Sequence, residues 1–405
     1  MSGTRPRIFV TGLGAVTGFG AGVAALARGL RRGAPAISPV TTFDPGAHRT
    51  QLAGMAPLPP QREGDPAARL GRGERFAVQA AEEAIVHAGL GAAELTAAGV
   101  FFGSSNGGLL EGEAFFRRLR RRERRLGLRQ VASHQNNGPG DAVARRFQCT
   151  GPVLTCSSAC TSANMALAAA LDALRAGECE VALAGGADAL SEVTYAGFNA
   201  LRAVDPGPSR PFRVDRAGLS MGEGAGVLLL ETEAHARARG AVVLAELAGA
   251  GATCDAHHMS APKDDALGPL HAMQRALDDA GESPSSVAFV NAHGTGTPHN
   301  DVVEARALRE LFGERVADVP VTSTKSLVGH LLGACGGLEA VVCVLGLLYR
   351  EVHPTGGDDP ADPELGLDVV IGGVRRLAGA RVALSNNLAF GGNNVTVVFR
   401  RAPHD

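Results

Sequence analysis

The sequence predicts an α/β protein with buried sheets. Strand-like apolar runs alternate with helical patterns along the 405 residues, which is typical of sheets that are covered by helices. Apolar residues make up 45% of the chain and glycine contributes 54 residues, a mixture that suits tight packing with many strand–helix turns. Tryptophan is absent and only 2 residues are tyrosine, so the core must be built from Ala, Val and Leu.

The expected elements follow one another in a regular order. Short apolar runs rich in β-branched residues predict strands at 8–11, 99–102, 181–184, 226–230, 287–291, 319–322 and 381–385. Longer stretches with apolar residues at helical spacing, or apolar throughout, predict helices at 74–88, 161–176, 267–280 and 330–348. The chain is long enough for two or three ordinary domains or for one large duplicated domain. A fresh start near 241–249 favours two halves, 1–245 and 246–405, although no internal repeat is visible by letter identity.

Composition excludes several classes of function. The net charge of −2 argues against a protein committed as a whole to nucleic acid or membrane surfaces. Seven cysteines without regular spacing do not form a disulfide framework, and neither CxxC pairs nor clustered histidines indicate a metal site. The N-terminus lacks the apolar segment of a signal peptide, and we find no apolar run close to the roughly 20 residues of a membrane span. We therefore expect a cytoplasmic protein without a metal.

One segment has an unusual composition. The stretch 115–130, "FFRRLRRRERRLGLRQ", carries eight arginines in a helix-compatible sequence. It is either a solvated helical face or a docking surface for an acidic protein. Nucleic acid is a weaker alternative, because no aromatic platform or nucleic-acid motif accompanies the arginines.

Two cysteines lie in "VLTCSSACTSANMALAAAL", which covers 153–171. Cys156 lies within the strand-like run and is interpreted as a small, inert side chain. Cys160 lies at the turn before an alanine-rich helix that is apolar on nearly every face and must be buried. The start of such a helix carries a partial positive charge, which favours a thiolate and a pKa below the free value of about 8.5. Burial acts in the opposite direction, so this expectation requires the helix end to dominate.

Three further strand ends carry candidate catalytic residues. "VNAHGTGTPHNDVVEA" places His293 after a strand, and "STKSLVGHLLGACGG" places Lys325 and His330 five residues apart. "ALSNNLAFGGNNV" places Phe390 beside a flexible pair of glycines. Together with Cys160, these strand ends predict one catalytic pocket that is built from loops.

These motifs resemble the β-ketoacyl-acyl-carrier-protein synthases, which are condensing enzymes with the thiolase fold. The resemblance covers nearly the whole chain. It rests on A-C-T-S at 159–162, N-A-H-G-T-G-T at 291–297 and K-S-x-x-G-H at 325–330 in this order, with "GGADA" at 185–189 and "SRPFRVDRAGLSMGEGAG" at 209–226. It implies a five-layer α-β-α-β-α fold of two similar halves and an enzyme that works as a dimer.

The resemblance also implies a reaction. Cys160 would take an acyl chain from an acyl carrier protein as a thioester. Malonyl-carrier protein would lose CO₂, and its enolate would attack that thioester to give a 3-oxoacyl-carrier protein. His293 and His330, as neutral imidazoles, would stabilise the enolate oxygen, and the backbone N–H groups of Cys160 and Phe390 would form the oxyanion hole. The pathway would be type II fatty-acid, polyketide or polyene synthesis.

The supporting roles follow from the same resemblance. Lys325, paired with Glu304, would order the two histidines electrostatically. Thr295 and Thr297 would bind the pantetheine arm, and Phe390 would gate the acyl pocket. The enzyme would need no cofactor of its own, because the carrier protein brings the phosphopantetheine. Further substrate contacts are expected from Phe198, Leu388 and Asn106.

The sequence departs from the family's pattern at a few positions. Leu388 stands where elongating members often carry Phe, and Cys335 stands where Ala is usual. Asn106 occupies a commonly apolar position near the end of the acyl pocket. We expect it to line that end, with His134 or Gln135 of the partner subunit, and to disfavour a long saturated chain. The alternative is that Asn106 turns away and bonds the backbone of 107–108.

Partners and competing functions complete the expectations. Carrier proteins are acidic, so Arg202 is expected at the docking surface, with Arg69, Arg72 and the run 117–125 as weaker candidates.

A degradative thiolase would need a second cysteine where Phe390 and its glycines stand, and a cysteine hydrolase would need neither the second histidine nor the lysine. A non-catalytic chain-length subunit would lack Cys160. The chain would form a homodimer, or would be the active half of a heterodimer with such a chain-length factor.

Overall fold

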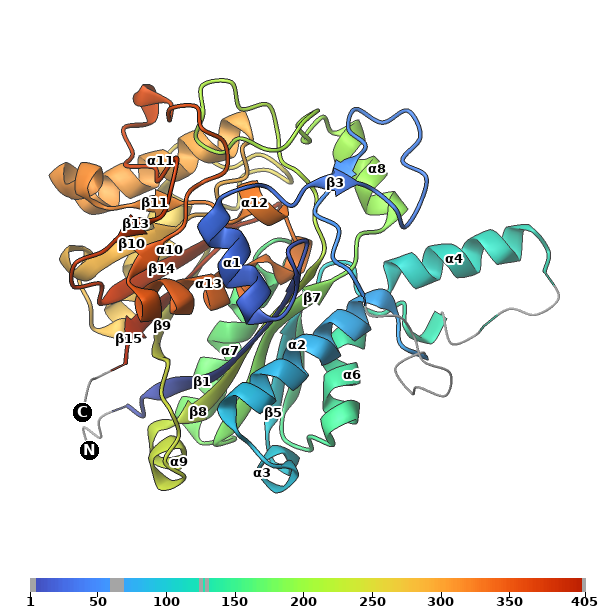
Figure 1. Cartoon of the computed structure of the whole chain (residues 1–405), viewed down its shortest axis with the longest axis horizontal. Coiled ribbons are helices and arrows are strands. Elements are labelled where there is room, and N and C mark those ends of the chain that lie inside the picture. The colour runs from blue at the N-terminus through green and yellow to red at the C-terminus, as the bar shows by residue number, and fades with distance from the viewer. Residues whose placement is uncertain (1–4, 59–68, 124–126, 128–130, 403–405) are drawn as a thin grey trace.

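The computed structural model describes residues 5–58, 69–123, 127 and 131–402 (Figure 1). One set of five paired strands comes from the first part of the chain: β1 (Ile8–Thr17), β5 (Gly99–Gly103), β6 (Val153–Cys156), β7 (Val181–Asp188) and β8 (Gly224–Thr232). A second set comes from the later part: β9 (Ala245–Cys254), β10 (Val287–Asn291), β11 (Val321–Thr322), β14 (Val382–Leu388) and β15 (Asn393–Arg401). The short strands are β2 (Gly20–Ala21), β3 (Ser38–Pro39), β4 (Leu52–Ala53), β12 (Glu351–Val352) and β13 (Arg375–Arg376).

The two sets share one topology. The first set is ordered β6-β5-β7-β8-β1 and the second is ordered β11-β10-β14-β15-β9. If the five strands of each set are numbered by their order in the chain, both sets have the spatial order 3-2-4-5-1. The pairings β6–β5–β7 and β11–β10–β14 are parallel, whereas the remaining pairings are antiparallel. The duplication is therefore visible in the strand order, and the division at 245/246 stays a prediction.

The helices build the remaining layers. They are α1 (Val23–Arg32), α2 (Arg72–Ala88), α3 (Ala92–Thr96), α4 (Leu109–Arg120), α6 (Gly138–Phe147), α7 (Ser162–Ala176), α8 (Glu192–Ala200), α9 (Glu233–Ala238), α10 (Leu267–Ala280), α11 (Pro298–Phe312), α12 (Lys325–Val328) and α13 (Cys335–Tyr349). In the described part of the chain, 3₁₀ helices cover Pro284–Ser286, Gly313–Asp318, Leu332–Ala334 and Pro363–Leu365.

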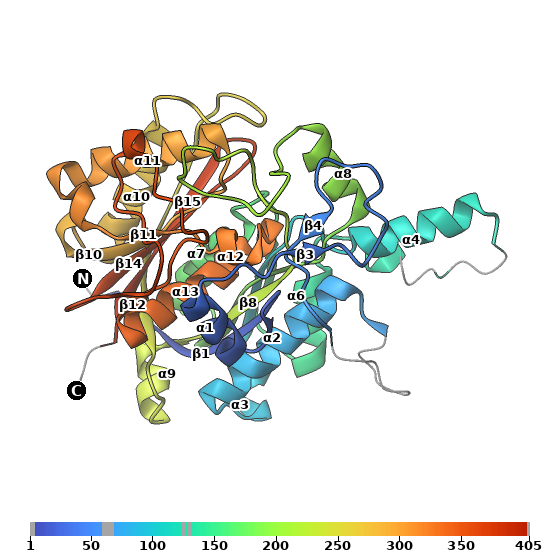
Figure 2. The ribbon, with the colours of Figure 1, turned by 45° about the horizontal axis from the view of Figure 1, so that its top comes forward.

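Helices α7 and α13 pack between the two sets of strands, and the other layers lie outside (Figures 1 and 2). The outer face of the first set is covered by α2 and α6, and α10 and α11 pack on the outer side of the second set. A continuous apolar core includes the inner faces of both sets and the two central helices. This arrangement is the expected five-layer fold, and the fold class is confirmed.

The central helix α13 is apolar along almost its whole length. Among the described residues, one window, Leu332–Tyr349, is long and apolar enough to cross a membrane by length and composition. However, 89% of that window is buried inside the protein, so in this fold it is a core helix. It lies close to β8 because position 226 is glycine: a Cβ there would lie 2.3 Å from Leu338 Cα.

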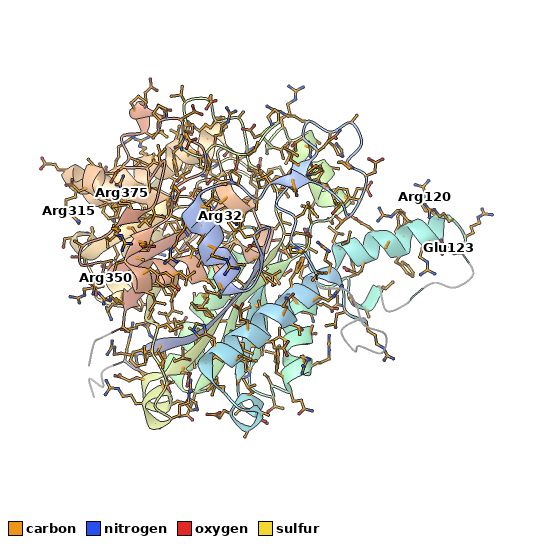
Figure 3. The ribbon with its side chains drawn as sticks, viewed as in Figure 1. Arg32, Arg120, Glu123, Arg315, Arg350 and Arg375 are labelled. Carbon is orange, nitrogen blue, oxygen red and sulfur yellow. The ribbon has the colours of Figure 1, made fainter. Side chains whose placement is uncertain are left out.

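The predicted helix at 330–348 begins too early. Leu332 has φ +57°, a left-handed conformation that interrupts a helix, and α13 begins only at Cys335. Among its described residues, the arginine-rich segment is helical up to Arg120, where helix α4 ends; this helix projects from the body (Figure 3). Residues 124–126 and 128–130 of that segment lie outside the described residues.

Candidate active site

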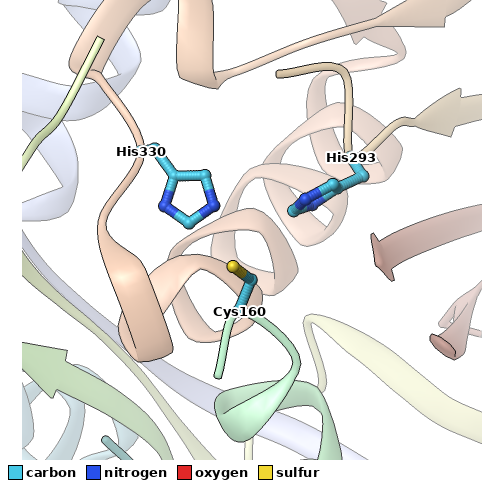
Figure 4. Close-up of side chains that lie close together, drawn as sticks. All are labelled: Cys160, His293 and His330. Atoms are coloured by element: carbon cyan, nitrogen blue, oxygen red, sulfur yellow. The ribbon is translucent and has the colours of Figure 1, made fainter. Parts of the chain in front are cut away.

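Three side chains from distant parts of the chain meet at the centre of the molecule. One donor atom from each of Cys160, His293 and His330 lies within 4.8 Å of the other two (Figure 4). All three residues are buried. Cys160 lies between β6 and α7, His293 follows β10, and His330 follows α12. The structure thus brings together the residues that the sequence analysis placed in one pocket.

The turn before α7 presents Cys160 in a constrained backbone. Ala159 has φ +51°, a left-handed conformation that costs an L-residue on the order of 1–3 kcal/mol. Hydrogen bonds hold this turn, since the Ser162 hydroxyl donates to the Ala159 carbonyl at 2.6 Å and accepts the Ser158 N–H at 2.9 Å. Cys156, by contrast, ends strand β6, as expected.

The Cys160 thiol is not the thiolate that the sequence analysis expected. Burial raises its pKa to about 11, although the Lys325 charge and hydrogen bonds from the backbone N–H groups of Phe390 and Cys160 act in the opposite direction. The start of helix α7 therefore does not outweigh desolvation. The resting enzyme carries a neutral thiol, with the two N–H groups of the expected oxyanion hole directed at the sulfur.

Both histidines are neutral. Burial, together with the Lys325 charge, lowers the pKa of His330 to about 3. Burial, Lys325 and His330 lower the pKa of His293 well below its usual value. His330 Nδ1 accepts the Leu332 N–H at 3.0 Å, which leaves the ring proton on Nε2. The two rings meet edge to face, with centroids 5.6 Å apart.

Lys325 pairs with Glu339, so the expected pairing with Glu304 is wrong. Lys325 Nζ lies 2.5 Å from Glu339 Oε1, and both side chains are 2% exposed. Burial alone would lower the pKa of Lys325, but the Glu339 carboxylate raises it above its usual value, and the lysine stays an ammonium. Glu339 also accepts Asn387 Nδ2–H at 2.6 Å. A signal existed for this residue, because Glu339 is the single charged residue of α13 and a buried carboxylate needs a partner.

Glu304 fixes the backbone on the other side of the site. Its two carboxylate oxygens accept the N–H groups of His293 and Gly294, each at 2.8 Å. Burial raises the pKa of Glu304 to about 7. Glu304 therefore supports His293, as the sequence analysis expected of it, but through the main chain rather than through Lys325.

A cavity of about 400 Å³ leads to these residues. The Phe198 and Phe390 rings stack at its wall, with centroids 5.6 Å apart. Phe390 precedes Gly391 and Gly392, which have φ +85° and +77° and give the loop a backbone that other residues adopt rarely. The expected site residues that line the cavity are Cys160, Phe198, Arg202, His293, Thr295, Thr297, His330, Leu388 and Phe390.

Asn106 does not line this cavity. It is 6% exposed, its Nδ2 donates to the Ala189 carbonyl at 2.9 Å, and its Oδ1 accepts the Thr194 hydroxyl at 2.9 Å. The alternative, that Asn106 bonds the backbone of 107–108, is corrected: a buried amide must satisfy its donor and its acceptor, and here neither partner is that backbone. A position at the end of the acyl pocket beside the partner subunit stays a prediction.

The three docking arginines differ in their surroundings. Arg72 is committed to the fold: it forms an ion pair with Glu223 at 2.5 Å and donates to the Ala56 carbonyl at 2.6 Å, so it is not free to dock a partner. Arg69 and Arg202 are exposed, and only Arg202 also borders the cavity.

The cluster of one thiol and two imidazoles has the donor set of a soft metal ion. However, the ammonium of Lys325 shifts the pKa of all three groups, which shows that its charge reaches each of them. A cation at this place would be repelled by that charge. The site is therefore better suited to stabilising an anion that develops during a reaction.

Comparison with known proteins agrees with this geometry. The family described as "Beta-ketoacyl synthase, N-terminal domain" matches residues 5–236, and "Beta-ketoacyl synthase, C-terminal domain" matches residues 244–357. The chain is 38% identical to 3-oxoacyl-[acyl-carrier-protein] synthase 2 of Synechocystis sp., over 98% of each chain.

Two solved structures are similar over the whole chain. The ishigamide ketosynthase/chain length factor has a TM-score of 0.93 and 32% identity, over 99% of this chain and 100% of the other. A type II polyketide ketosynthase in complex with its acyl-carrier protein has a TM-score of 0.88 and 27% identity, over 99% and 100%.

The buried ion pair gives a prediction for stability. Glu339→Gln leaves the Lys325 ammonium without a counter-charge and should lower the free energy of unfolding by about 3–5 kcal/mol. The double variant Lys325→Met, Glu339→Gln should recover most of that loss, because it removes both charges. Chemical denaturation at neutral pH measures both effects. If the single variant unfolds at the same denaturant concentration as the wild-type protein, this account is contradicted.

Proposed function

Because the chain belongs to the β-ketoacyl synthase family, we propose that it catalyses a decarboxylative condensation between an acyl group on Cys160 and malonyl-acyl-carrier protein. The product is a 3-oxoacyl-carrier protein. The observation that carries this proposal is the buried cluster of one thiol and two neutral imidazoles at the end of a cavity. A non-catalytic chain-length subunit would not need this arrangement.

The first half-reaction loads the enzyme. Cys160 Sγ attacks the thioester carbonyl of an acyl-carrier protein, and the thiol proton passes to a neutral imidazole within reach. The carbonyl oxygen becomes an oxyanion that accepts the N–H groups of Cys160 and Phe390. The oxyanion then collapses, the bond to the carrier's sulfur breaks, and that sulfur leaves with the proton from the imidazole. Since the resting thiol is neutral, a proton acceptor is required at this step.

The second half-reaction forms the carbon–carbon bond. The malonyl group loses CO₂, and the electron pair of the broken bond moves onto the thioester as an enolate. His330 Nε2–H and His293 donate to the enolate oxygen; neutral donors stabilise it without handing over a proton that would quench the carbanion. The enolate carbon attacks the acyl carbonyl on Cys160, the bond to Sγ breaks, and Cys160 leaves as a thiolate. The thiolate takes up one proton from solvent, which is the proton that decarboxylative condensation consumes overall.

The carrier protein delivers both substrates. We propose no resident cofactor, because the phosphopantetheine arm arrives with the partner and enters a cavity that Thr295 and Thr297 line. The two threonine hydroxyls lie 2.9 Å apart, and their position supports hydrogen bonding to the amides of that arm. Arg202, exposed at the cavity, is proposed to meet the acidic surface of the carrier.

We further propose that the enzyme acts as a dimer in the cytoplasm. Strand β6 ends the described strand order, and its Val153 and Leu154 are each 44% exposed, which is unusual for apolar side chains in a sheet and suits coverage by another subunit. The partner is a second copy or a chain-length factor, as in the ishigamide structure. The pathway is fatty-acid, polyketide or polyene synthesis.

The assignment of the nucleophile predicts different effects for the two neighbouring cysteines. Cys160→Ala should abolish acyl loading and condensation, whereas Cys156→Ala should retain most activity, because Cys156 lies outside the cavity lining. Intact-mass spectrometry after incubation with an acyl-carrier protein locates the adduct. An acyl group on Cys156, or turnover by Cys160→Ala, would show that the nucleophile is assigned wrongly.

The histidines are expected to act mainly in decarboxylation. Loss of one well-aimed oxyanion donor typically slows a reaction by about 10²–10³. His293→Ala and His330→Ala should therefore each release CO₂ from malonyl-carrier protein more slowly by about this factor. Cys160 should still acquire an acyl group in both variants, but more slowly in His293→Ala, because His330 Nδ1 already accepts the Leu332 N–H and its Nε2 carries the ring proton. Normal CO₂ release by both variants would refute this division of roles.

Charge reversal at Arg202 tests the docking surface. Arg202→Glu should raise KM for carrier-bound substrates, because it places a carboxylate opposite an acidic partner, and should leave a small thioester analogue unaffected. Steady-state kinetics with both substrate forms measures the difference. If both forms lose activity equally, Arg202 serves the fold and not docking.

A further inference from the structure

A buried carboxylate close to the site has no part in the reaction described above. Asp188, the last residue of β7, is 0% exposed. Its Oδ1 accepts the Ser104 hydroxyl at 2.6 Å and the Asn106 N–H at 2.9 Å. Its Oδ2 accepts the Ser105 N–H at 2.9 Å and the Gly333 N–H at 2.7 Å. Four donors on one buried carboxylate indicate that Asp188 holds the surrounding main chain in a fixed position.

The four donors come from two separate parts of the protein. Ser104, Ser105 and Asn106 follow strand β5 in the first set of strands. Gly333 belongs to the 3₁₀ turn Leu332–Ala334, which lies between His330 and helix α13. Asp188 therefore connects the loop after β5 to the turn that carries a catalytic histidine. The approach is close, because a Cβ on Gly333 would lie 2.5 Å from the Ser105 nitrogen and 2.8 Å from Asp188 Oδ2.

The turn that Asp188 holds is strained. Leu332 has φ +57°, and such a conformation persists only where the surroundings enforce it. The N–H of this residue is the donor to His330 Nδ1, at 3.0 Å. The backbone of His330 is fixed separately, since its N–H donates to the Ser220 carbonyl and its carbonyl accepts the Gly222 N–H. At the ring itself, Nδ1 has two neighbours, the Leu332 N–H and, at 3.6 Å, Cys335 Sγ. The Leu332 N–H is the shorter contact and can only donate, so it sets the tautomer.

We propose that Asp188 is a positioning residue for the decarboxylation step, which rests on the function proposed above. By holding the Gly333 N–H, it keeps Leu332 in its left-handed conformation and the Leu332 N–H directed at His330 Nδ1. The proton of His330 then stays on Nε2, where it can be donated to the enolate oxygen. Asp188 also holds the Ser105 N–H, and the Ser105 hydroxyl donates to the Ala159 carbonyl at 2.9 Å. The turn at Cys160 keeps its two hydrogen bonds through Ser162, so acyl loading should fall less than CO₂ release.

The chemistry of the four contacts requires a carboxylate. All four partners reach Asp188 as donors, and three of them are backbone N–H groups that cannot reverse their role. Burial raises the pKa of Asp188 to about 6 in spite of these bonds, so the group is ionised at neutral pH. Asparagine has the same shape, but it removes the charge and places an NH₂ group against at least one N–H.

Three variants separate this role from a purely structural one. Asp188→Asn should slow CO₂ release from malonyl-carrier protein about tenfold, because a hydrogen bond to a charged group is replaced by a weaker one. Acyl loading of Cys160 should fall by a smaller factor, because Ser162 still holds the Ala159 turn. Asp188→Ala should slow CO₂ release further. The matched control is Ser104→Ala, which removes one donor from the same carboxylate but keeps the Gly333 link, and which should release CO₂ at the wild-type rate.

The outcomes that overturn the proposal are distinct. If Asp188→Asn releases CO₂ at the wild-type rate, Asp188 does not act through His330. The same conclusion follows if the rates of acyl loading and of CO₂ release fall by the same factor. If Asp188→Ala does not fold, as judged by thermal unfolding, the Asp188→Asn variant decides. The wild-type enzyme is assayed alongside: absence of CO₂ release there would refute the proposed function itself rather than the role of Asp188.

Discussion

A fixed positive charge that reaches every group of the buried site belongs to one ion pair, Lys325 with Glu339. The ammonium disfavours protonation of both His293 and His330, and it acts against the burial that keeps Cys160 a thiol. Burial alone would lower the pKa of a lysine at this depth, and the Glu339 carboxylate beside Lys325 reverses that shift. Glu339 therefore serves the reaction without contacting the reacting atoms, because it keeps a fixed positive charge where negative charge develops.

The duplicated fold explains how so many groups converge. Both central helices, α7 and α13, are enclosed by the same two sets of strands, and α13 carries Glu339 in its second turn. One half supplies the nucleophile and the other supplies both imidazoles. Asp188 links the two halves, because it accepts the Ser104 hydroxyl from the first half and the Gly333 N–H from the second. The geometry of the site therefore depends on how the two halves pack against each other.

Local patterns predicted the elements that have strong local signals. Strand β10 and helix α10 have the expected bounds, and the strand-end motifs identified the residues that meet in the cavity. Strand β9, "AELAGAGATC", was not predicted because its small residues have weak strand preference; Gly249 and Gly251 are needed there so that α10 can approach. The pairing of Lys325 and the pKa of Cys160 were wrong because each depends on three-dimensional burial and neighbours that sequence distance does not encode.

The central claim is that His293 and His330 are neutral donors at the pH at which the enzyme works. Nitrogen-15 NMR of enzyme labelled at its 12 histidines, with His293→Ala and His330→Ala to assign the signals, measures this directly. The account predicts that both rings keep the shifts of neutral imidazole between about pH 8 and pH 5, a range in which an ordinary histidine titrates. An imidazolium signal from either residue above about pH 6 would contradict it.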